Sequence, residues 1–320
     1  MTQESIEQFV RPQVCRILAL DGGGAKGMYS LGVLKEVEAQ AGKPLCEVFD
    51  LIYGTSTGSI IGAMLGLGWS VQSILDKYLV NVPTIMKASS PAEKSAALKA
   101  TGDKIFDGKG FADMKTDIGI VSTRWQTERP MIFKTGVHLA HGRKASFVPA
   151  FGVPLVDAIQ ASCSAYPFFE RKVVKTSAGD EIELIDGGYC ANNPTLFALT
   201  DATGPLGYRP EDCRVLSVGC GTYPEPKPSL KMWIARKYVV TVQLLQKTME
   251  TNTNTMEQLR SFIFKSVPSV RVNDTYERPE MATDLFEHDP KKLSLLRQLG
   301  EESFAKREVD ITKLIFNGDK

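Results

Sequence analysis

The sequence predicts an α/β fold in which a mostly parallel sheet is covered by helices on both faces. Six apolar runs bounded by turn residues have the composition of strands: 14–20, 48–53, 118–123, 131–136, 181–186 and 214–219. Stretches with the spacing of amphipathic helices lie between several of them, as at 28–40 and 153–166. Strands without polar alternation that alternate with helices indicate a sheet buried on both faces.

Composition and charge narrow the class of protein. The chain has 320 residues, of which 43% are hydrophobic and 23% charged, as in an ordinary folded protein. Its formal net charge of +1 leaves no global field that would draw it onto DNA or RNA. No internal repeat or Pro/Gly-rich linker divides the sequence, so we expect one domain over residues 1–320.

The apolar segments and the cysteines indicate a cytoplasmic protein without a metal site. Residues 1–12 lack the pattern of a secretory signal, and the longest apolar window, 60–69, is far shorter than the roughly 20 residues that span a bilayer. The six cysteines form no CxxC pair and have no close histidine partners. We therefore expect reduced thiols and no zinc.

The first strand runs into a glycine loop, DGGGAKG at residues 21–27. Gly22, Gly24 and Gly27 fit the GxGxxG pattern of dinucleotide-binding folds, so nucleotide binding is one hypothesis. The acidic residue that should end the next strand in such folds is missing, and no Gly-Lys-Ser/Thr completes a P-loop. The other hypothesis is that the amides of Gly22, Gly23 and Gly24 stabilise an oxyanion.

The second strand runs into Gly54-Thr55-Ser56-Thr57-Gly58. In a GxSxG turn between a strand and a helix, the small residues permit a tight bend that exposes the serine hydroxyl. Ser56 is therefore the candidate nucleophile, and the amide of Thr57 at the helix start is a further oxyanion donor. The alternative is a glycine-rich helix start in which Ser56 or Thr55 is only an N-cap.

The base that would activate Ser56 is not an obvious histidine. The chain has only three histidines, and two of them stand in a loop-like basic stretch. Asp186 ends a predicted strand and is followed by Gly187 and Gly188, which leave room for a substrate. We expect a parallel sheet to bring Asp186 beside Ser56 from the end of a neighbouring strand. By itself, this DGG motif is also consistent with an ordinary turn.

Two regions look like additions to the core. Residues 81–110 are polar and lysine-dotted, which suits a surface helix pair or a mobile lid. From about residue 224 the pattern becomes almost wholly helical. This tail could cap the sheet, form a dimer surface or hold a ligand.

Three motifs in this order, DGGGAKG, GTSTG and DGGYCANNP, resemble those of the patatin-like phospholipases. The segment 156–169 is similar to the family's helix between nucleophile and aspartate, so the likeness spans residues 14–222. It implies a patatin-like three-layer α/β/α domain with a mostly parallel central sheet. The core would cover about 14–222 and a helical C-terminal extension about 224–320.

The same resemblance implies the chemistry of the site. Ser56 would be the nucleophile and Asp186 the base of a dyad that hydrolyses lipid acyl esters without histidine, metal or other cofactor. Gly22 to Gly24 would form the oxyanion loop. Many relatives have arginine where Lys26 stands, which puts an orienting role of that side chain in doubt.

A narrower resemblance, carried by residues 32–59 and 117–136, is to the CapV-type patatin-like effectors of bacterial antiphage signalling. It implies that a cyclic dinucleotide, 3′,3′-cyclic GMP-AMP or a related one, activates the enzyme. Membrane phospholipids at the inner face of the cell membrane would be the substrate, and their loss would be the antiphage (CBASS) response. We expect residues 81–110 and Trp69 to contact the lipid.

Candidate residues for nucleotide binding fall within one short stretch of the chain. The cations that could bind two phosphates are Arg124, Arg129, Lys134, Arg143 and Lys144. The rings that could stack on the bases are Trp125 and His138. Charged residues that flank strands are also typical of a solvated rim, so each of them has a purely structural alternative.

Three other functions are consistent with the same residues. The chain could be a constitutive patatin-like hydrolase without nucleotide control, a nucleotide-binding module that uses the glycine loop, or an inert patatin-like scaffold. Labelling by a fluorophosphonate separates them, because only an activated serine reacts. A homo-oligomer formed through the helical tail is compatible with ligand-driven activation.

Overall fold

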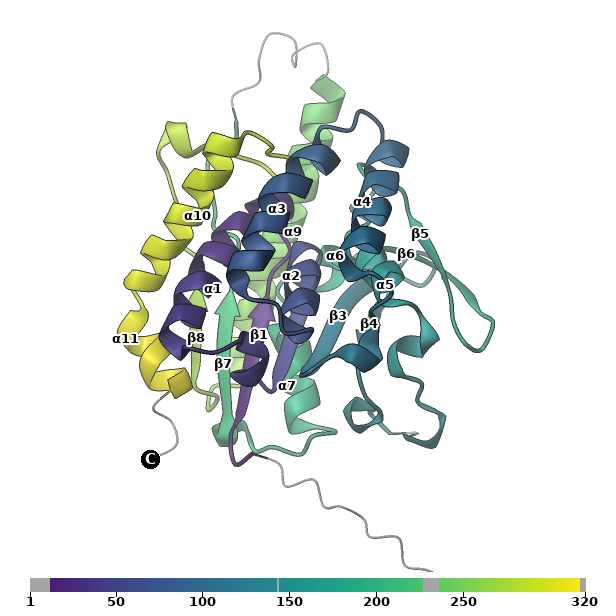
Figure 1. Cartoon of the computed structure of the whole chain (residues 1–320), viewed down its shortest axis with the longest axis vertical. Coiled ribbons are helices and arrows are strands. Elements are labelled where there is room, and N and C mark those ends of the chain that lie inside the picture. Colours follow the sequence, from purple (N-terminus) through teal and green to yellow (C-terminus); the bar gives the residue numbers. More distant parts are fainter. Residues whose placement is uncertain (1–11, 143, 227–235, 317–320) are drawn as a thin grey trace, which may run out of the picture.

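The structure, a computed structural model of the whole chain, describes residues 12–142, 144–226 and 236–316. Its centre is an eight-stranded sheet made of β1 Cys15–Leu20, β2 Leu51–Thr55, β3 Asp117–Arg124, β4 Pro130–Lys134, β5 Lys172–Lys175, β6 Glu181–Asp186, β7 Cys213–Val218 and β8 Ser269–Val272. The helices are α1 Gly27–Ala41, α2 Thr57–Gly66, α3 Val71–Met86, α4 Pro91–Phe106, α5 Leu155–Ser162, α6 Gly188–Ala191, α7 Thr195–Thr203, α9 Arg236–Ile263, α10 Pro290–Ala305 and α11 Glu308–Ile311. Figure 1 shows these elements coloured along the chain.

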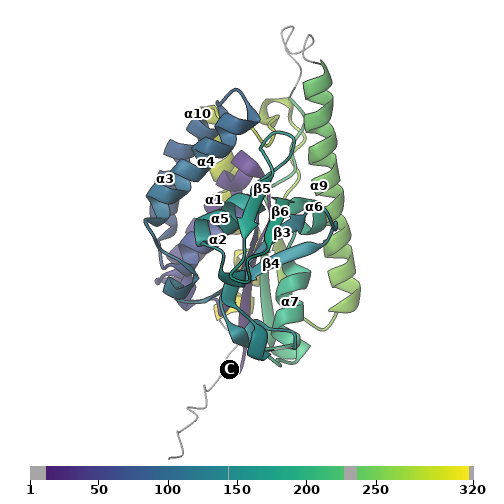
Figure 2. The same ribbon diagram turned by 90° about the vertical axis from the view of Figure 1, so that its right-hand side faces the viewer.

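Helices cover both faces of the sheet and give three layers. Seen edge-on in Figure 2, α1 to α5 and α10 lie on one face and α6, α7 and α9 on the other. Successive residues of β1 point to opposite faces, so Leu18 and Leu20 belong to one core and Cys15 and Ile17 to the other. The predicted three-layer α/β/α arrangement is confirmed.

The sheet is parallel at its centre and antiparallel at one side. β1 pairs in parallel with β2 and β7, β2 with β3, and β7 with β8. β4 and β6 pair antiparallel with β3, and β5 with β6. All six predicted strands are present. β5 and β8 are not among them, because each has only four residues and lies at an end of the strand order.

β2 and β6 meet end to end along one edge of β3. Thr55 at the end of β2 pairs with Val121, and Asp186 at the end of β6 pairs with the next residue, Ser122. β4 pairs with the same part of β3 and so occupies its other edge. The expectation that Ser56 and Asp186 end neighbouring parallel strands is wrong, because β6 runs antiparallel and approaches β2 head-on.

Residues 81–110 fall largely in two surface helices, the end of α3 and all of α4. α4 opens with a capping box, in which the Ser90 hydroxyl accepts from the Glu93 amide and the Glu93 carboxylate accepts from the Ser90 amide. α3 packs against α1 and α4, and α4 packs against α5. The helix-pair prediction is therefore confirmed.

Trp69 is the aromatic residue expected to contact lipid. It follows α2, a helix about 15 Å long that starts beside Ser56 and runs away from it. Trp69 is partly buried against the core at the far end of that helix. Trp69 thus lies about a helix length from Ser56, and its contact with lipid stays a prediction.

The helical tail packs on both faces of the sheet. α9 packs against α6 and α7 on one face, and α10 packs against α1 on the other. Between them, β8 extends the sheet beside β7. The tail thus caps the sheet, which is the first of the three roles expected for it.

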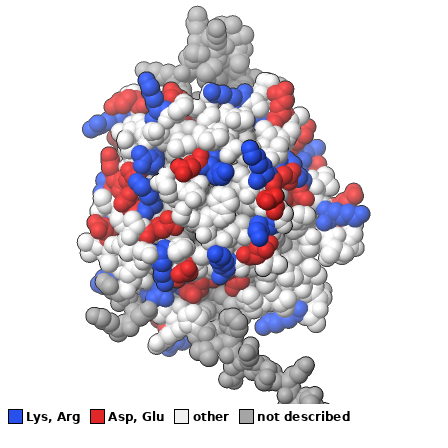
Figure 3. Space-filling model, viewed as in Figure 1, with Lys and Arg blue, Asp and Glu red and all other residues white. Residues whose placement is uncertain are grey.

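Surface charge is mixed on the face that carries α3, α4 and α10. Figure 3 shows Lys and Arg interspersed with Asp and Glu there, without a field of one sign. Across the described residues, no helix combines the length and the apolarity that crossing a membrane requires.

Candidate active site

Ser56 stands at the turn between β2 and α2 in a strained conformation. Its φ is 51° and its ψ is −123°, a region that residues with side chains rarely occupy. The turn is tight enough that a Cβ on Gly54 would lie 2.2 Å from the Gly58 carbonyl oxygen. A Cβ on Gly58 would lie equally close to the Leu20 carbonyl oxygen. These contacts explain why both flanking positions are glycine, and the geometry is that of a nucleophile elbow.

Asp186 lies within hydrogen-bonding distance of Ser56. The Ser56 Oγ donates to Asp186 Oδ2 at 2.7 Å, and the Gly188 amide donates to Oδ1 at 2.7 Å. Asp186 is fully buried. Burial raises the pKa of its carboxyl to about 7, although the bonds from Ser56 and Gly188 lower it. A carboxylate with such a pKa accepts a proton at neutral pH more readily than an exposed one.

Ser162 at the end of α5 braces the turn from the other side. Its hydroxyl accepts from the Ser56 amide at 2.8 Å and donates to the Val121 carbonyl at 2.6 Å. The side chain is fully buried, so both bonds are shielded from water. Ser162 thereby ties the elbow to β3, and no motif in the sequence indicated it.

The glycine loop faces Ser56 with two of its three candidate amides. Gly23 and Gly24 line the same cavity as Ser56 and Thr57. Neither of their amides bonds to any acceptor in the described part of the chain. The Gly22 amide instead donates to the Asn192 carbonyl at 3.1 Å, so the prediction that Gly22 binds the oxyanion is wrong.

Thr57 and Tyr78 fix the loop against α2. The Thr57 hydroxyl donates to the Gly24 carbonyl at 2.8 Å, and the Tyr78 hydroxyl bonds to the same oxygen at 2.7 Å. Gly24 has a φ of +56°, and a Cβ there would lie 2.3 Å from the Leu285 carbonyl oxygen. The Thr57 amide opens α2 and has no acceptor within the helix, so it also points toward the cavity.

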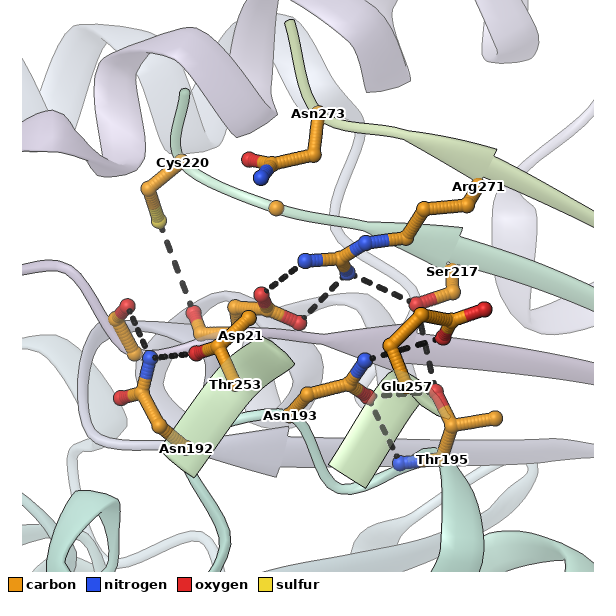
Figure 4. A network of polar contacts seen from close by, with 12 residues as sticks. Asp21, Asn192, Asn193, Thr195, Ser217, Cys220, Thr253, Glu257, Arg271 and Asn273 are labelled. Carbon is orange, nitrogen blue, oxygen red and sulfur yellow. Dashed lines mark hydrogen bonds and ion pairs between the residues drawn. The ribbon is translucent and has the colours of Figure 1, made fainter. Parts of the chain in front are cut away.

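A buried polar network behind the loop fixes its base (Figure 4). Arg271 of β8 makes a two-pronged ion pair with Asp21, the residue before Gly22, and also donates to Ser217. The Asn192 side-chain amide donates to the Gly22 carbonyl at 3.2 Å and to Thr253 of α9 at 2.8 Å. Gly22 is thus bonded to Asn192 in both directions, which locks the loop to the segment after Asp186.

α9 contacts both halves of the site. The Asn252 side chain accepts from the backbone amide of Asn192 at 2.8 Å and donates to the Cys190 carbonyl at 3.0 Å. Two residues before Asn252, Glu250 lies 3.6 Å from the buried ammonium of Lys26, which sits at the end of the glycine loop. Lys26 therefore has a structural partner on α9.

The cavity above Ser56 is mainly apolar. Besides Ser56 and Asp186, its wall is formed chiefly by hydrophobic side chains, including Ile60, Val82, Leu98, Phe169, Met249 and Phe286. Such a wall excludes water and suits hydrocarbon better than a sugar or a nucleotide. The motif glycine Gly187 packs against β3, because a Cβ there would lie 2.2 Å from the Val121 carbonyl oxygen.

The residues predicted to bind a nucleotide do not gather at one place. Lys134 is buried and pairs with Asp201 at 2.7 Å, while His138 pairs with Asp117 at 2.6 Å. Lys134 pairs with Gly119 in the sheet, five residues from Arg124, so the two ends of the group are about 16 Å apart along β3.

The other candidate residues lie at the opposite end of β3. Arg124 and Arg129 flank the turn between β3 and β4, and the Arg171 guanidinium stacks 4.8 Å from the centre of the Trp125 ring. Arg143 lies outside the described residues. The prediction of a single cluster is therefore wrong, because a strand pair separates its members.

No histidine reaches the dyad in the described residues. His138 bonds to Asp117 and His141 to Asp201, both away from the Ser56 cavity. His288 bonds to the Phe286 carbonyl. Among the described residues, no three or more His, Cys, Asp or Glu side chains are placed together to hold a metal ion.

Comparison with known proteins gives a consistent result. The model of the family described as patatin-like phospholipase matches residues 18–199. The chain is 56% identical over 310 residues to a cUMP-AMP-activated phospholipase of Escherichia coli, covering 97% of both chains. It is 30% identical over 220 residues to a cGAMP-activated phospholipase of Pseudomonas aeruginosa, covering 64% of this chain and 62% of that one. Among solved structures, VipD from Legionella pneumophila has 12% identity and a TM-score of 0.47, over 92% of this chain and 67% of that one.

Proposed function

The chain belongs to the patatin-like phospholipase family, and from that premise we propose that Ser56 and Asp186 are its catalytic dyad. Membership makes the chain a phospholipase, a carboxylic ester hydrolase. The substrate we propose is the fatty-acyl ester of membrane glycerophospholipids. The observation that carries the proposal is the 2.7 Å bond between Ser56 Oγ and Asp186 Oδ2 at the floor of an apolar cavity.

The mechanism proceeds through an acyl-enzyme. Asp186 takes the proton of Ser56 as Oγ attacks the ester carbonyl carbon. The resulting oxyanion accepts hydrogen bonds from the amides of Gly23, Gly24 and Thr57. When the carbon–oxygen bond to the glycerol breaks, the leaving alkoxide takes the proton back from Asp186. The same carboxylate then activates a water that hydrolyses the acyl ester of Ser56, releasing the fatty acid.

The activity should depend on the ionisation of Asp186. The base must be deprotonated, and burial raises the pKa of this carboxyl to about 7. We therefore expect kcat/KM to fall about tenfold per pH unit below that value and to level off above it. A pH profile with a water-soluble ester checks this. Full activity down to the pH range of an exposed aspartate would contradict it.

We also propose that a cyclic dinucleotide activates the enzyme. The support is the name of the Escherichia coli relative, a cUMP-AMP-activated phospholipase, together with the cGAMP-activated relative. The resemblance to CapV-type effectors favours cyclic GMP-AMP as the activator. The higher identity to the cUMP-AMP-activated relative makes cUMP-AMP the better candidate. The enzyme, a single domain, would then act at the cytoplasmic face of the membrane and degrade the cell's own lipid as an antiphage response.

Fluorophosphonate labelling with and without nucleotide tests this proposal. We expect labelling at Ser56 to rise when cUMP-AMP is added, and to rise less with cGAMP. Equal labelling without nucleotide would indicate a constitutive hydrolase, and no labelling under any condition would indicate an inert scaffold. Light scattering in the same samples would report whether the nucleotide drives formation of a homo-oligomer.

A further inference from the structure

A second apolar cavity adjoins the catalytic one, between α2, α3, α4 and α5. Five residues line both cavities: Ile60, Tyr78, Val82, Ile85 and Leu98. Beyond them, the second cavity is bounded mainly by hydrophobic side chains such as Met64, Ile105, Phe106, Val156 and Ile159. The apolar space above Ser56 therefore continues into the outer helical layer.

The direction of this space is set by α2. Ser56 precedes the helix, Ile60 lies one turn in, and Met64 lies one turn further. Because an α-helix rises 1.5 Å per residue, Met64 is about 12 Å along the axis from Ser56. The second cavity thus leads away from the nucleophile along α2, on the side covered by α3 and α4.

Apolar cavities of this kind are filled by apolar ligands rather than by water. When an ester carbonyl is held at Ser56, the acyl chain attached to that carbonyl is the hydrocarbon segment that must lie next to the nucleophile and needs such a space. On the basis of the proposed function, we propose that the substrate's acyl chain extends along α2 into the second cavity, and that Gly102 of α4 determines how long a chain fits.

Gly102 lines the second cavity, one turn of α4 beyond Leu98, and has no side chain of its own. It stands inside α4, where glycine is disfavoured relative to alanine. Its φ is not positive, so the backbone does not require glycine. A Cβ there would lie 2.8 Å from Val156 Cγ1 across the space between α4 and α5. Without a side chain at Gly102, α4 approaches α5 closely at this wall of the second cavity, so a larger side chain there would displace Val156 or enter the cavity.

Substitution of Gly102 should change chain-length preference. We expect Gly102→Leu to lower the ratio of kcat/KM for p-nitrophenyl decanoate over p-nitrophenyl butyrate by at least about tenfold. Both esters are assayed with cUMP-AMP present. Ala100→Leu adds the same bulk to an exposed position of the same helix and is the matched control. Ile105→Phe, which fills the same cavity, is a second variant should Gly102→Leu fold poorly.

Binding of a fatty acid gives a readout that does not need turnover. In the Ser56→Ala background, fluorescent cis-parinaric acid should bind, and Gly102→Leu should weaken that binding by at least about tenfold. An unchanged ester ratio and unchanged binding in both cavity variants would overturn the role of the second cavity. Butyrate hydrolysis that survives in Ser56→Ala would overturn the proposed function instead, so the two failures are distinguishable.

Discussion

Ser56→Ala is expected to abolish fluorophosphonate labelling and to lower kcat by about 10⁴-fold or more. The reason is that the substitution removes the attacking atom, the hydroxyl that bonds to the Asp186 carboxylate. The neighbouring hydroxyl of Ser162 is bonded to the Val121 carbonyl and the Ser56 amide. Activity on phosphatidylglycerol vesicles with cUMP-AMP is the measurement. Substantial activity in this variant would contradict the proposed mechanism.

Asp186→Asn should change the melting temperature as well as the activity. We expect a similar loss of kcat, because an amide cannot take the Ser56 proton. Burial raises the pKa of Asp186, so the folded state holds its proton more tightly than the unfolded state does. Above both pKa values the ionised carboxylate therefore opposes folding, and its removal should raise the melting temperature at about pH 8.

The pairing of lost activity with gained stability excludes misfolding as the cause. Asp212→Asn is a suitable control, because Asp212 pairs with the exposed Arg209 on the surface, away from the dyad. It should change neither quantity appreciably. If Asp186→Asn kept activity, another base would be needed, and His138 is a poor substitute because it bonds to Asp117 away from the Ser56 cavity.

The parts of the site that follow local rules could be predicted from the sequence. Gly54 and Gly58 are required by the close approach of backbone at the elbow, so GxSxG marks Ser56 with no knowledge of the rest of the fold. A strand that ends in Asp-Gly-Gly similarly marks Asp186. What the sequence could not predict was how they meet, because the antiparallel course of β6 depends on pairing with β3 and not on any feature of β6 alone.

The residues that hold the site in place were not predicted for the same reason. Ser162, Asn192 and Arg271 act through hydrogen bonds to groups far away in the chain, which the local sequence around them does not reveal. The prediction of a nucleotide-binding cluster was wrong for the opposite reason. Its members are close in sequence, but an extended strand separates residues by about 3.3 Å each, so Lys134 and Arg124 ended at opposite ends of β3.

Arg271→Met is expected to destabilise the protein more than any surface ion-pair variant. Asp21 is 3% exposed and sits directly before the glycine loop, so removal of Arg271 leaves a buried carboxylate without its partner. Breaking one side of a buried pair typically costs about 3–5 kcal/mol in the free energy of unfolding. Urea unfolding measures this loss. The control is Arg209→Met, whose side chain is 75% exposed and whose surface pair with Asp212 should contribute little to stability.

The double variant Asp21→Asn/Arg271→Met shows whether the lost stability is electrostatic. Because it removes the stranded charge along with its partner, it should recover part of the loss seen in Arg271→Met. Its activity should stay low, since the Arg271 bonds to Asp21 and Ser217 that hold the loop's base are both gone. Equal stability of the single and double variants would instead assign Arg271 a packing role. The separation of stability from activity in this pair is what identifies β8, 250 residues from Asp21, as the support of the glycine loop.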